Sequence, residues 1–258
     1  AVSIYADEND FNVDAKAAIL IDSDSGKVLY EKNADEQCYP ASTTKIMTAL
    51  LAFEAIDRGE LSMDQVITVK QEALDSITDP EASTIYLAAG EEVPVKDLLY
   101  SIMLPSANDA ANVMAVVVSG DVDTFVEKMN SRAKELGCTG THFANPNGLH
   151  DDDHYTTARD MALIARECMK HEQFRKMAST GEYAMPATNY SQPRDLYTTD
   201  YMIRPGSCFY YEYANGIKTG YTSSAGHCLI SSATRYFNEE GAPVATDDVS
   251  EDEEYTVR

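Results

Sequence analysis

Ser42 and Lys45 lie three residues apart in a largely apolar stretch, residues 39–56, and this pair is the first candidate for chemistry. Residues i and i+3 share one face of a helix, so the spacing predicts that the hydroxyl and the amine lie within hydrogen-bonding distance. A lysine with an ordinary pKa is neutral in only about one molecule in 2,500 at pH 7, whereas burial lowers that pKa. The pair therefore predicts a serine nucleophile with a lysine base whose pKa has fallen by about 3.

This spacing alone is weak evidence, because the chain contains it twice. Ser131 and Lys134 have the same separation within a charged segment, whose periodicity predicts an exposed helix. Only the pair at Ser42 and Lys45 has apolar surroundings that would remove water from the amine. We therefore expect chemistry at the first pair, and the second pair provides an internal control.

A second motif, Gly-Ile-Lys-Thr-Gly, places Lys218 and Thr219 near the end of an expected strand. A lysine and a threonine at a sheet edge can hold a carboxylate, and Gly220 lets a ligand approach the backbone closely. The charge of Lys218 could also lower the pKa of Lys45. Taken alone, the motif is equally typical of an ordinary strand end.

A third motif, Pro-Ser-Ala-Asn, follows an expected helix. Pro105 ends that helix because its ring lacks an N–H donor and clashes with a preceding turn. Ser106 and Asn108 fall at this break, where their side chains can point into a cleft. Capping of the next helix is the alternative explanation for both residues.

The elements that must position these motifs indicate an α+β fold. Residues 17–22 and 27–30 alternate like a hairpin around a Ser-Asp-Ser-Gly turn, and residues 213–222 and 226–237 predict a second hairpin. Helical periodicity covers residues 93–104, 110–118, 123–137 and 156–171 between them. We expect one antiparallel sheet built from both chain ends and packed against helices, with a mostly helical subdomain between them.

The composition excludes several classes of partner. The 258 residues include 20 Lys or Arg and 43 Asp or Glu, which gives a formal net charge of −23. This charge repels phosphate backbones and anionic membrane surfaces, so we expect no nucleic-acid partner. No apolar window of roughly 18 residues could span a bilayer. Nor does a basic stretch with an apolar run open the chain, which fits a cytosolic protein or a secreted one whose signal peptide has been removed.

Two groups of residues raise questions of metals and disulfides. Five cysteines lie far apart without metal-ligand spacing, and we expect thiols packed as small hydrophobic residues rather than a disulfide framework. The run His-Asp-Asp-Asp-His at residues 150–154 could ligate zinc or calcium. An Asp-rich turn before a Thr-capped helix explains the run more simply, so no metal site is predicted.

In this order, the three motifs resemble the active-site signature of the penicillin-recognising serine enzymes. The similarity extends over about residues 16–235, including "YPASTTKIMTALLA", "DLLYSIMLPSANDAANVMA" and "ANGIKTGYTSSAGHCLISSATR". These blocks resemble the secreted D-alanyl-D-alanine carboxypeptidases of bacterial cell walls. The resemblance implies a DD-peptidase/β-lactamase-like fold and an extracytoplasmic enzyme that needs no metal or organic cofactor. Its implied partners are the peptidoglycan pentapeptide and β-lactam antibiotics.

The resemblance also implies a role for each motif residue. Ser42 would be the acylated nucleophile, Lys45 its base, and Ser106 a proton relay to the leaving D-alanine. Asn108 would hold the substrate amide, and Lys218 and Thr219 would face its terminal carboxylate, with Gly220 as a substrate-binding residue that permits close approach. The backbone N–H groups of Ser42 and Tyr221 would bind the oxyanion. Three alternatives remain: a β-lactamase, for which a class A member would need a glutamate base, a transpeptidase, and a catalytically silent penicillin-binding module.

We expect the serine DD-peptidase domain to cover residues 1–237, with sheet-forming parts at about 16–60 and 205–237 and a helical part at about 61–175. Residues 238–258 are rich in acidic side chains and predict a loop or tail. By comparison with the family it resembles, we expect the last strand and the C-terminal helix to be missing, with "YTVR" as a candidate start of that strand.

Overall fold

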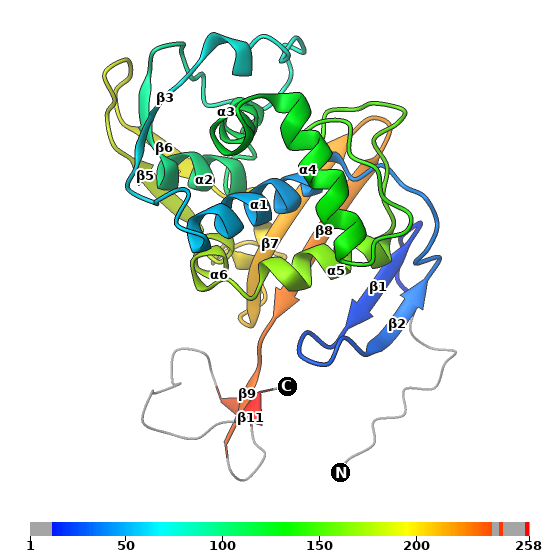
Figure 1. Cartoon of the computed structure of the whole chain (residues 1–258). Helices are drawn as coiled ribbons and strands as arrows, with labels where there is room; N and C mark the ends of the chain where they lie inside the picture. Colours follow the sequence, from blue (N-terminus) through cyan, green and yellow to red (C-terminus); the bar gives the residue numbers. More distant parts are fainter. Residues whose placement is uncertain (1–11, 239–242, 245–255, 258) are drawn as a thin grey trace.

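A buried helix passes through the middle of the fold (Figure 1). The computed structural model describes residues 12–238, 243–244 and 256–257. Within it, the 3-10 turn η1 (Ala41–Thr44) leads directly into helix α1 (Lys45–Asp57). The nine residues from Lys45 to Phe53 are all buried. The apolar stretch around the first motif is therefore an internal helix, as its composition predicts.

Five further helices surround α1. They are α2 (Val95–Met103), α3 (Asn108–Ser119), α4 (Val122–Glu135), α5 (Ala158–Cys168) and α6 (Glu172–Ala178). The first four contact α1 and also form the continuous apolar core with it. Local capping sets two of their starts, because Asp121 and Thr157 accept backbone hydrogen bonds from Thr124 and Asp160. The four predicted helices are confirmed, whereas α6 was not predicted.

Both predicted hairpins are present. Strands β1 (Ala18–Ile21) and β2 (Val28–Lys32) pair antiparallel, and so do β7 (Ala214–Thr222) and β8 (Gly226–Ala233). The α+β class is confirmed, but the structure differs in one respect. Within the described residues the hairpins form separate two-stranded sheets rather than one sheet. Helix α5 contacts both β1 and β8, so the two hairpins are linked through a helix and not through a shared ladder.

Short strands complete the fold, and the sequence pattern was too brief to predict them. Strand β3 (Val66–Thr68) pairs with β4 (Glu92–Pro94), and β5 (Glu182–Met185) pairs with β6 (Arg194–Tyr197). The three-residue turns η2 (Gln71–Ala73) and η3 (Tyr201–Ile203) are 3-10 helices. Strand β9 (Tyr236–Phe237) lies between β10 (Pro243–Val244) and β11 (Thr256–Val257). Most of the predicted acidic tail, residues 238–258, lies outside the described residues.

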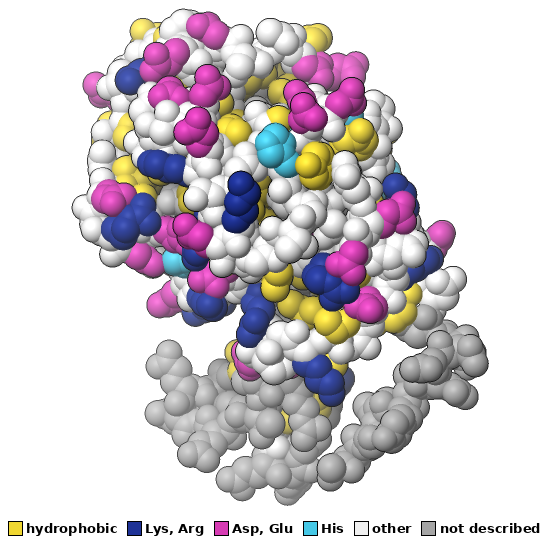
Figure 2. Space-filling model, turned by 45° about the vertical axis from the view of Figure 1, so that its right-hand side comes forward, with side chains coloured by type: hydrophobic (Ala, Val, Ile, Leu, Met, Phe, Trp, Pro, Cys, Tyr) yellow, Lys and Arg dark blue, Asp and Glu magenta, His cyan; other side chains and the backbone are white. Residues whose placement is uncertain are grey.

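The surface carries the acidic excess of the sequence. Figure 2 shows acidic side chains spread over much of one face, with fewer basic side chains between them. All five cysteines are free thiols. Cys138 and Cys168 are buried, as expected for packed thiols, whereas Cys38 and Cys228 are partly exposed and Cys208 is exposed. Across the part of the chain that the structure describes, no helix is both long and apolar enough to cross a bilayer.

A buried ion pair joins the loop before β4 to strand β6. The Glu91 carboxylate is fully buried and accepts two hydrogen bonds from the Arg194 guanidinium, at 2.8 and 3.2 Å. Burial alone raises the pKa of Glu91, but the hydrogen bonds from Arg194, Thr188 and the Ala88 backbone outweigh it and hold the pKa below its usual value. The pair therefore stabilises the folded state wherever the carboxyl is ionised.

Replacing Arg194 with methionine should lower the free energy of unfolding by about 3–5 kcal/mol, because it leaves the Glu91 charge buried and unpaired. The matched control is Arg58→Met, whose pair with Glu60 is exposed and should contribute about 0–1 kcal/mol. Since the pKa of Glu91 is lower in the folded state, this stability is present above the unfolded value near 4.5 and is lost as pH falls through the folded value. Urea unfolding at neutral and acidic pH measures both effects, and equal losses in the two variants would contradict the prediction.

Candidate active site

The Lys45 ammonium lies against the Ser42 hydroxyl in the interior of the protein. Lys45 Nζ is 3.1 Å from Ser42 Oγ, 2.6 Å from Asn108 Oδ1 and 2.6 Å from the Asn147 carbonyl oxygen. In the charged form these contacts use all three N–H donors, whereas in the neutral form two N–H groups donate and the nitrogen lone pair can accept from the Ser42 hydroxyl. The side chain has no exposed surface. The predicted hydrogen-bonding distance between hydroxyl and amine is confirmed.

The surroundings of Lys45 favour its neutral form. Burial is the main cause that lowers its pKa well below 10.5, and the charge of Lys218 lowers it further. The Asp109 carboxylate acts in the opposite direction but does not cancel these effects. The direction of the expected change in the pKa of Lys45, and the contribution of Lys218 to it, agree with these surroundings, whereas its size stays a prediction. An amine with a lowered pKa beside a hydroxyl can accept the hydroxyl proton near neutral pH.

A hydrogen-bonded chain supports the turn that carries Ser42. Thr44 Oγ1 donates to the Ala41 carbonyl at 2.8 Å and lies 2.7 Å from His154 Nε2. His154 Nδ1 accepts from the Ala144 backbone N–H, so the ring proton must be on Nε2, which donates to Thr44. Burial lowers the pKa of His154 to about 4, which keeps this ring neutral at pH 7. The turn η1 is thus held in place by a neutral His154 through the Thr44 hydroxyl.

Two glycines let other segments approach the same turn. A Cβ on Gly148 would lie 1.9 Å from the Ala41 carbonyl oxygen, and a Cβ on Gly220 would lie 2.9 Å from the Ser42 nitrogen. Gly148 also has a backbone φ of +86°, which residues with a side chain rarely adopt. These glycines therefore permit backbone contact that any larger residue would prevent.

Substitution of Gly148 by alanine should displace the Ser42 turn and lower the rate of any reaction at Ser42 by about a hundredfold, since a misplacement of about 1 Å costs that much. Gly181→Ala is the control, because a Cβ there meets no atom within 4 Å. The second-order rate of serine acylation, with thermal unfolding of each variant, is the measurement. Unchanged acylation in Gly148→Ala would contradict the expected displacement.

Ser106 has an unusual backbone and an unsatisfied hydroxyl. Its φ is +65°, in the left-handed region that non-glycine residues seldom occupy. The residue is buried, and its Oγ has no hydrogen-bond partner within the described residues. A strained residue with an unpaired buried donor is typical of a functional position. Asn108 begins α3 two residues later, with its side chain on Lys45.

The loop before β4 holds this corner in place. The Asn108 N–H donates to the Ser83 carbonyl at 2.8 Å, and Ser83 Oγ donates to the Pro105 carbonyl at 2.6 Å. The buried Asp109 carboxylate accepts backbone hydrogen bonds from Ile85 and Leu87. The third motif is therefore tied to a neighbouring loop by at least four hydrogen bonds.

Strand β7 supplies the Lys-Thr-Gly motif. Lys218 is almost completely buried and donates from Nζ to the Thr219 carbonyl at 3.0 Å. Burial lowers the pKa of Lys218 to about 7, although the charge of Asp200 opposes this shift. Thr219 Oγ1 lies 2.5 Å from Thr199 Oγ1, and Tyr221 is exposed on the same strand. Of the predicted residues, Ser42, Lys45 and Asn108 are joined directly by hydrogen bonds.

Sequence reasoning missed four residues at this site: Asn147, His154 in its supporting role, Thr199 and Asp200. Asn147 contributes a backbone carbonyl, which every residue has, so no side-chain pattern could have marked it. Both ring nitrogens of His154 are used inside the protein, which removes it from a metal site at residues 150–154. Among the described residues, no group of three His, Cys, Asp or Glu side chains is placed to hold a metal ion.

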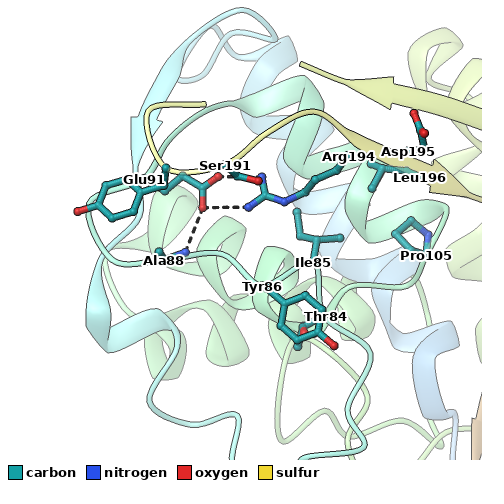
Figure 3. Close-up of a pocket in the computed structure, with 11 residues that line it drawn as sticks. Thr84, Ile85, Tyr86, Ala88, Glu91, Pro105, Ser191, Arg194, Asp195 and Leu196 are labelled. Carbon is teal, nitrogen blue, oxygen red and sulfur yellow. Dashed lines mark hydrogen bonds and ion pairs between the residues drawn. The ribbon is translucent and has the colours of Figure 1, made fainter. Parts of the chain in front are cut away.

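A cavity of about 480 Å³ lies beside the third motif (Figure 3). Its walls come from the loop before β4, from Pro105, and from strand β6 with the residues preceding it. Figure 3 shows the Arg194 guanidinium directed at Glu91, whose carboxylate also accepts from the Ala88 N–H. The ion pair between Glu91 and Arg194 thus fixes one wall of the cavity. Pro105 lines another part of it and is followed directly in the chain by Ser106.

Comparison with known proteins gives a family match over nearly the whole chain. Residues 4–245 match the family model described as D-alanyl-D-alanine carboxypeptidase. The D-alanyl-D-alanine carboxypeptidase DacF of Bacillus subtilis is 42% identical over 222 residues, which cover 86% of this chain and 54% of that protein. The chain thus spans about half the length of the curated relatives it matches.

Solved structures show the same fold. The Streptomyces K15 DD-transpeptidase has a TM-score of 0.75 and 30% sequence identity, over 86% of each chain. Penicillin-binding protein D2 of Listeria monocytogenes, in a cefotaxime-bound form, has a TM-score of 0.74 and 30% identity, over 86% of this chain and 85% of that one.

Proposed function

This chain belongs to the D-alanyl-D-alanine carboxypeptidase family, and we therefore propose that it is a serine-type carboxypeptidase that removes the terminal D-alanine from peptidoglycan stem peptides. The observation that carries the proposal is the buried Lys45 amine, 3.1 Å from Ser42 Oγ and with a lowered pKa. The site is proposed to work outside the cytoplasm, where peptidoglycan lies.

In the first half of the reaction, Ser42 Oγ attacks the carbonyl carbon of the penultimate D-alanine while its proton passes to neutral Lys45. The backbone N–H groups of Ser42 and Tyr221 bind the oxyanion of the tetrahedral intermediate. The proton then passes through Ser106 to the leaving amine as the C–N bond breaks. The products are free D-alanine and an ester on Ser42.

In the second half, water attacks the ester carbonyl, and Lys45 again accepts and returns the proton. The bond to Ser42 Oγ breaks, which restores the hydroxyl and releases the shortened peptide. The unpaired, buried Ser106 hydroxyl supports its assignment as the relay, because it is free to bond to a leaving group.

Substrate binding is assigned to residues around the nucleophile. Asn108 holds the substrate amide, and Lys218 with Thr219 binds the terminal carboxylate, with Gly220 allowing close approach. A β-lactam carries a carboxylate and a reactive amide carbonyl, so we propose that it acylates Ser42 in the same way. The cefotaxime-bound relative supports this ligand class.

A transpeptidase is the second candidate, because one structural relative is named as a DD-transpeptidase. The two activities share the acyl-enzyme and differ only in whether water or an amine accepts the acyl group. A β-lactamase would release hydrolysed penicillin rapidly instead of retaining it.

Intact-mass spectrometry tests the proposal. The protein is incubated with benzylpenicillin, then separately with diacetyl-Lys-D-Ala-D-Ala in the presence and absence of glycine as an amine acceptor. A single penicilloyl adduct and released D-alanine support the carboxypeptidase. A glycine-capped peptide indicates transpeptidation, and rapid loss of the adduct with accumulated penicilloate indicates a β-lactamase. An unmodified protein that releases no D-alanine would overturn the proposal.

A further inference from the structure

Asp200 has a buried carboxylate with one oxygen unaccounted for. Only 2% of the residue is exposed. Its Oδ1 accepts the Met202 N–H at 2.9 Å and so caps the short turn η3. Its Oδ2 is buried and has no hydrogen-bond partner within the described residues. Capping uses one oxygen only, so it does not explain why a full carboxylate is buried here.

Lys218 is a buried cation with few hydrogen-bond partners. Its side chain is 1% exposed, and one hydrogen bond, to the Thr219 carbonyl, is recorded for its three donors. The turn η3 packs against β7, and the Thr199 and Thr219 hydroxyls lie 2.5 Å apart. Asp200 and Lys218 are the chain neighbours of these two threonines. A buried anion and a buried cation therefore lie on adjoining elements, although no hydrogen bond or ion pair joins them among the described residues.

The two buried lysines of the site each have one buried carboxylate nearby. Asp109 raises the pKa of Lys45, and Asp200 raises the pKa of Lys218, while Lys218 lowers the pKa of Lys45. Lys218 in turn lowers the pKa of Asp200, which burial otherwise raises. Asp200, the N-cap of η3, is thus the charged group that acts on Lys218, and Lys218 in turn acts on Lys45 of α1.

We propose that Asp200 is a positioning residue for the proposed reaction: its carboxylate, buried beside the turn that packs against β7, favours the charged form of Lys218 next to Thr219, where the ligand carboxylate binds. This inference rests on the proposed function of the site. Asp200 acts on Lys218 as a nearby buried charge and not on the substrate, so its effect on the reaction passes through the lysine. Without the Asp200 carboxylate, the buried Lys218 ammonium would lose the one negative charge that is named above as raising its pKa.

The consequence is a specific change in pH dependence. Removing the Asp200 charge lowers the pKa of Lys218 below its present value of about 7, so the lysine becomes neutral at lower pH. The ligand carboxylate then loses its positively charged partner at a lower pH than in the parent. The decline of the acylation rate on the alkaline side of the profile therefore begins at a lower pH. Loss of the Lys218 charge also raises the pKa of Lys45, which moves the acidic limb upward. The profile should therefore narrow from both sides.

The test uses Asp200→Asn, which is nearly isosteric and retains an oxygen to cap Met202. Second-order acylation by benzylpenicillin is measured between about pH 5 and pH 10. We expect the alkaline limb to move down by about one pH unit, which is roughly a tenfold loss of rate above neutral pH. Asp200→Glu should restore most of the parent profile. Asp97→Asn is the control: Asp97 is also buried with a raised pKa, but it lies in α2 and bonds to the Tyr183 hydroxyl.

A second measurement does not depend on turnover. NMR titration of lysine labelled at Cε, with the Lys218 signal identified through Lys218→Arg, reports the charge of Lys218 directly. A lower midpoint in Asp200→Asn supports the inference even if the protein proves inactive. An unchanged midpoint, or a profile that merely scales down as in the Asp97→Asn control, would overturn it and leave Asp200 as a cap for η3. Failure of the parent to react with penicillin would instead count against the proposed function.

Discussion

Replacing Ser42 with alanine is expected to abolish the penicilloyl adduct and to reduce D-alanine release by at least about 10⁴-fold, because loss of a serine nucleophile removes the covalent route entirely. The Lys45 ammonium retains its bonds to Asn108 and to the Asn147 carbonyl, so the fold should be preserved. Intact-mass spectrometry after incubation with benzylpenicillin gives the first readout. A stopped assay of free D-alanine gives the second.

The matched control is Ser131→Ala, at the repeated Ser-x-x-Lys spacing in α4. Ser131 and Lys134 are exposed, whereas Lys45 has no exposed surface. The control variant should acylate at the parent rate. An adduct that persists in Ser42→Ala and disappears in Ser131→Ala would contradict the prediction, because it would make Ser131 in α4 the nucleophile.

Replacing Lys45 with methionine is expected to lower the acylation rate by about 10²–10⁴-fold, the usual contribution of a general base. Methionine fills similar space but cannot take the Ser42 proton. It also leaves Asn108 Oδ1 and the Asn147 carbonyl without a donor, at a cost of about 1–3 kcal/mol each, so unfolding must be measured alongside. Lys134→Met is the control and should change neither quantity appreciably.

The pH dependence of the parent provides an independent check on Lys45. Its pKa lies well below 10.5 in the folded protein, because burial and the Lys218 charge both disfavour the ammonium. The acylation rate should therefore rise with pH while Lys45 loses its proton and stop rising below about pH 10, with the decline on the alkaline side set by loss of the Lys218 charge. A rate that continues to climb past that point would show that an ordinary lysine, or hydroxide, removes the proton.

Local pattern predicted helix α1 well, because the information for it is contained in one continuous segment. The apolar run around α1 predicted burial of the helix. Together with that burial, the three-residue spacing predicted contact between Ser42 and Lys45. The same is true of the hairpin β7–β8, whose strand pattern and turn residues are adjacent in sequence. These features depend on periodicity, which a single chain displays directly.

The rest of the site depends on distant segments and on backbone groups. No local pattern could indicate that the Asn147 carbonyl would accept from Lys45, or that Gly148 would lie against Ala41. The buried Asp200 looked like one acidic residue among many, because burial and a missing partner are properties of the folded chain. The separation of the two hairpins has the same origin, since strand pattern does not specify which edges pair.

The close approach of Gly148 and Gly220 to the Ser42 turn has a consequence for folding kinetics. The turn, the loop at Gly148 and strand β7 are far apart along the chain, so their contact must wait for long-range closure, which is slow relative to helix formation. Reactivity toward penicillin would then appear only after the helices and both flanking segments have docked. A fluorescent penicillin added during refolding would report the last step of assembly, whereas circular dichroism would report the earlier formation of helices.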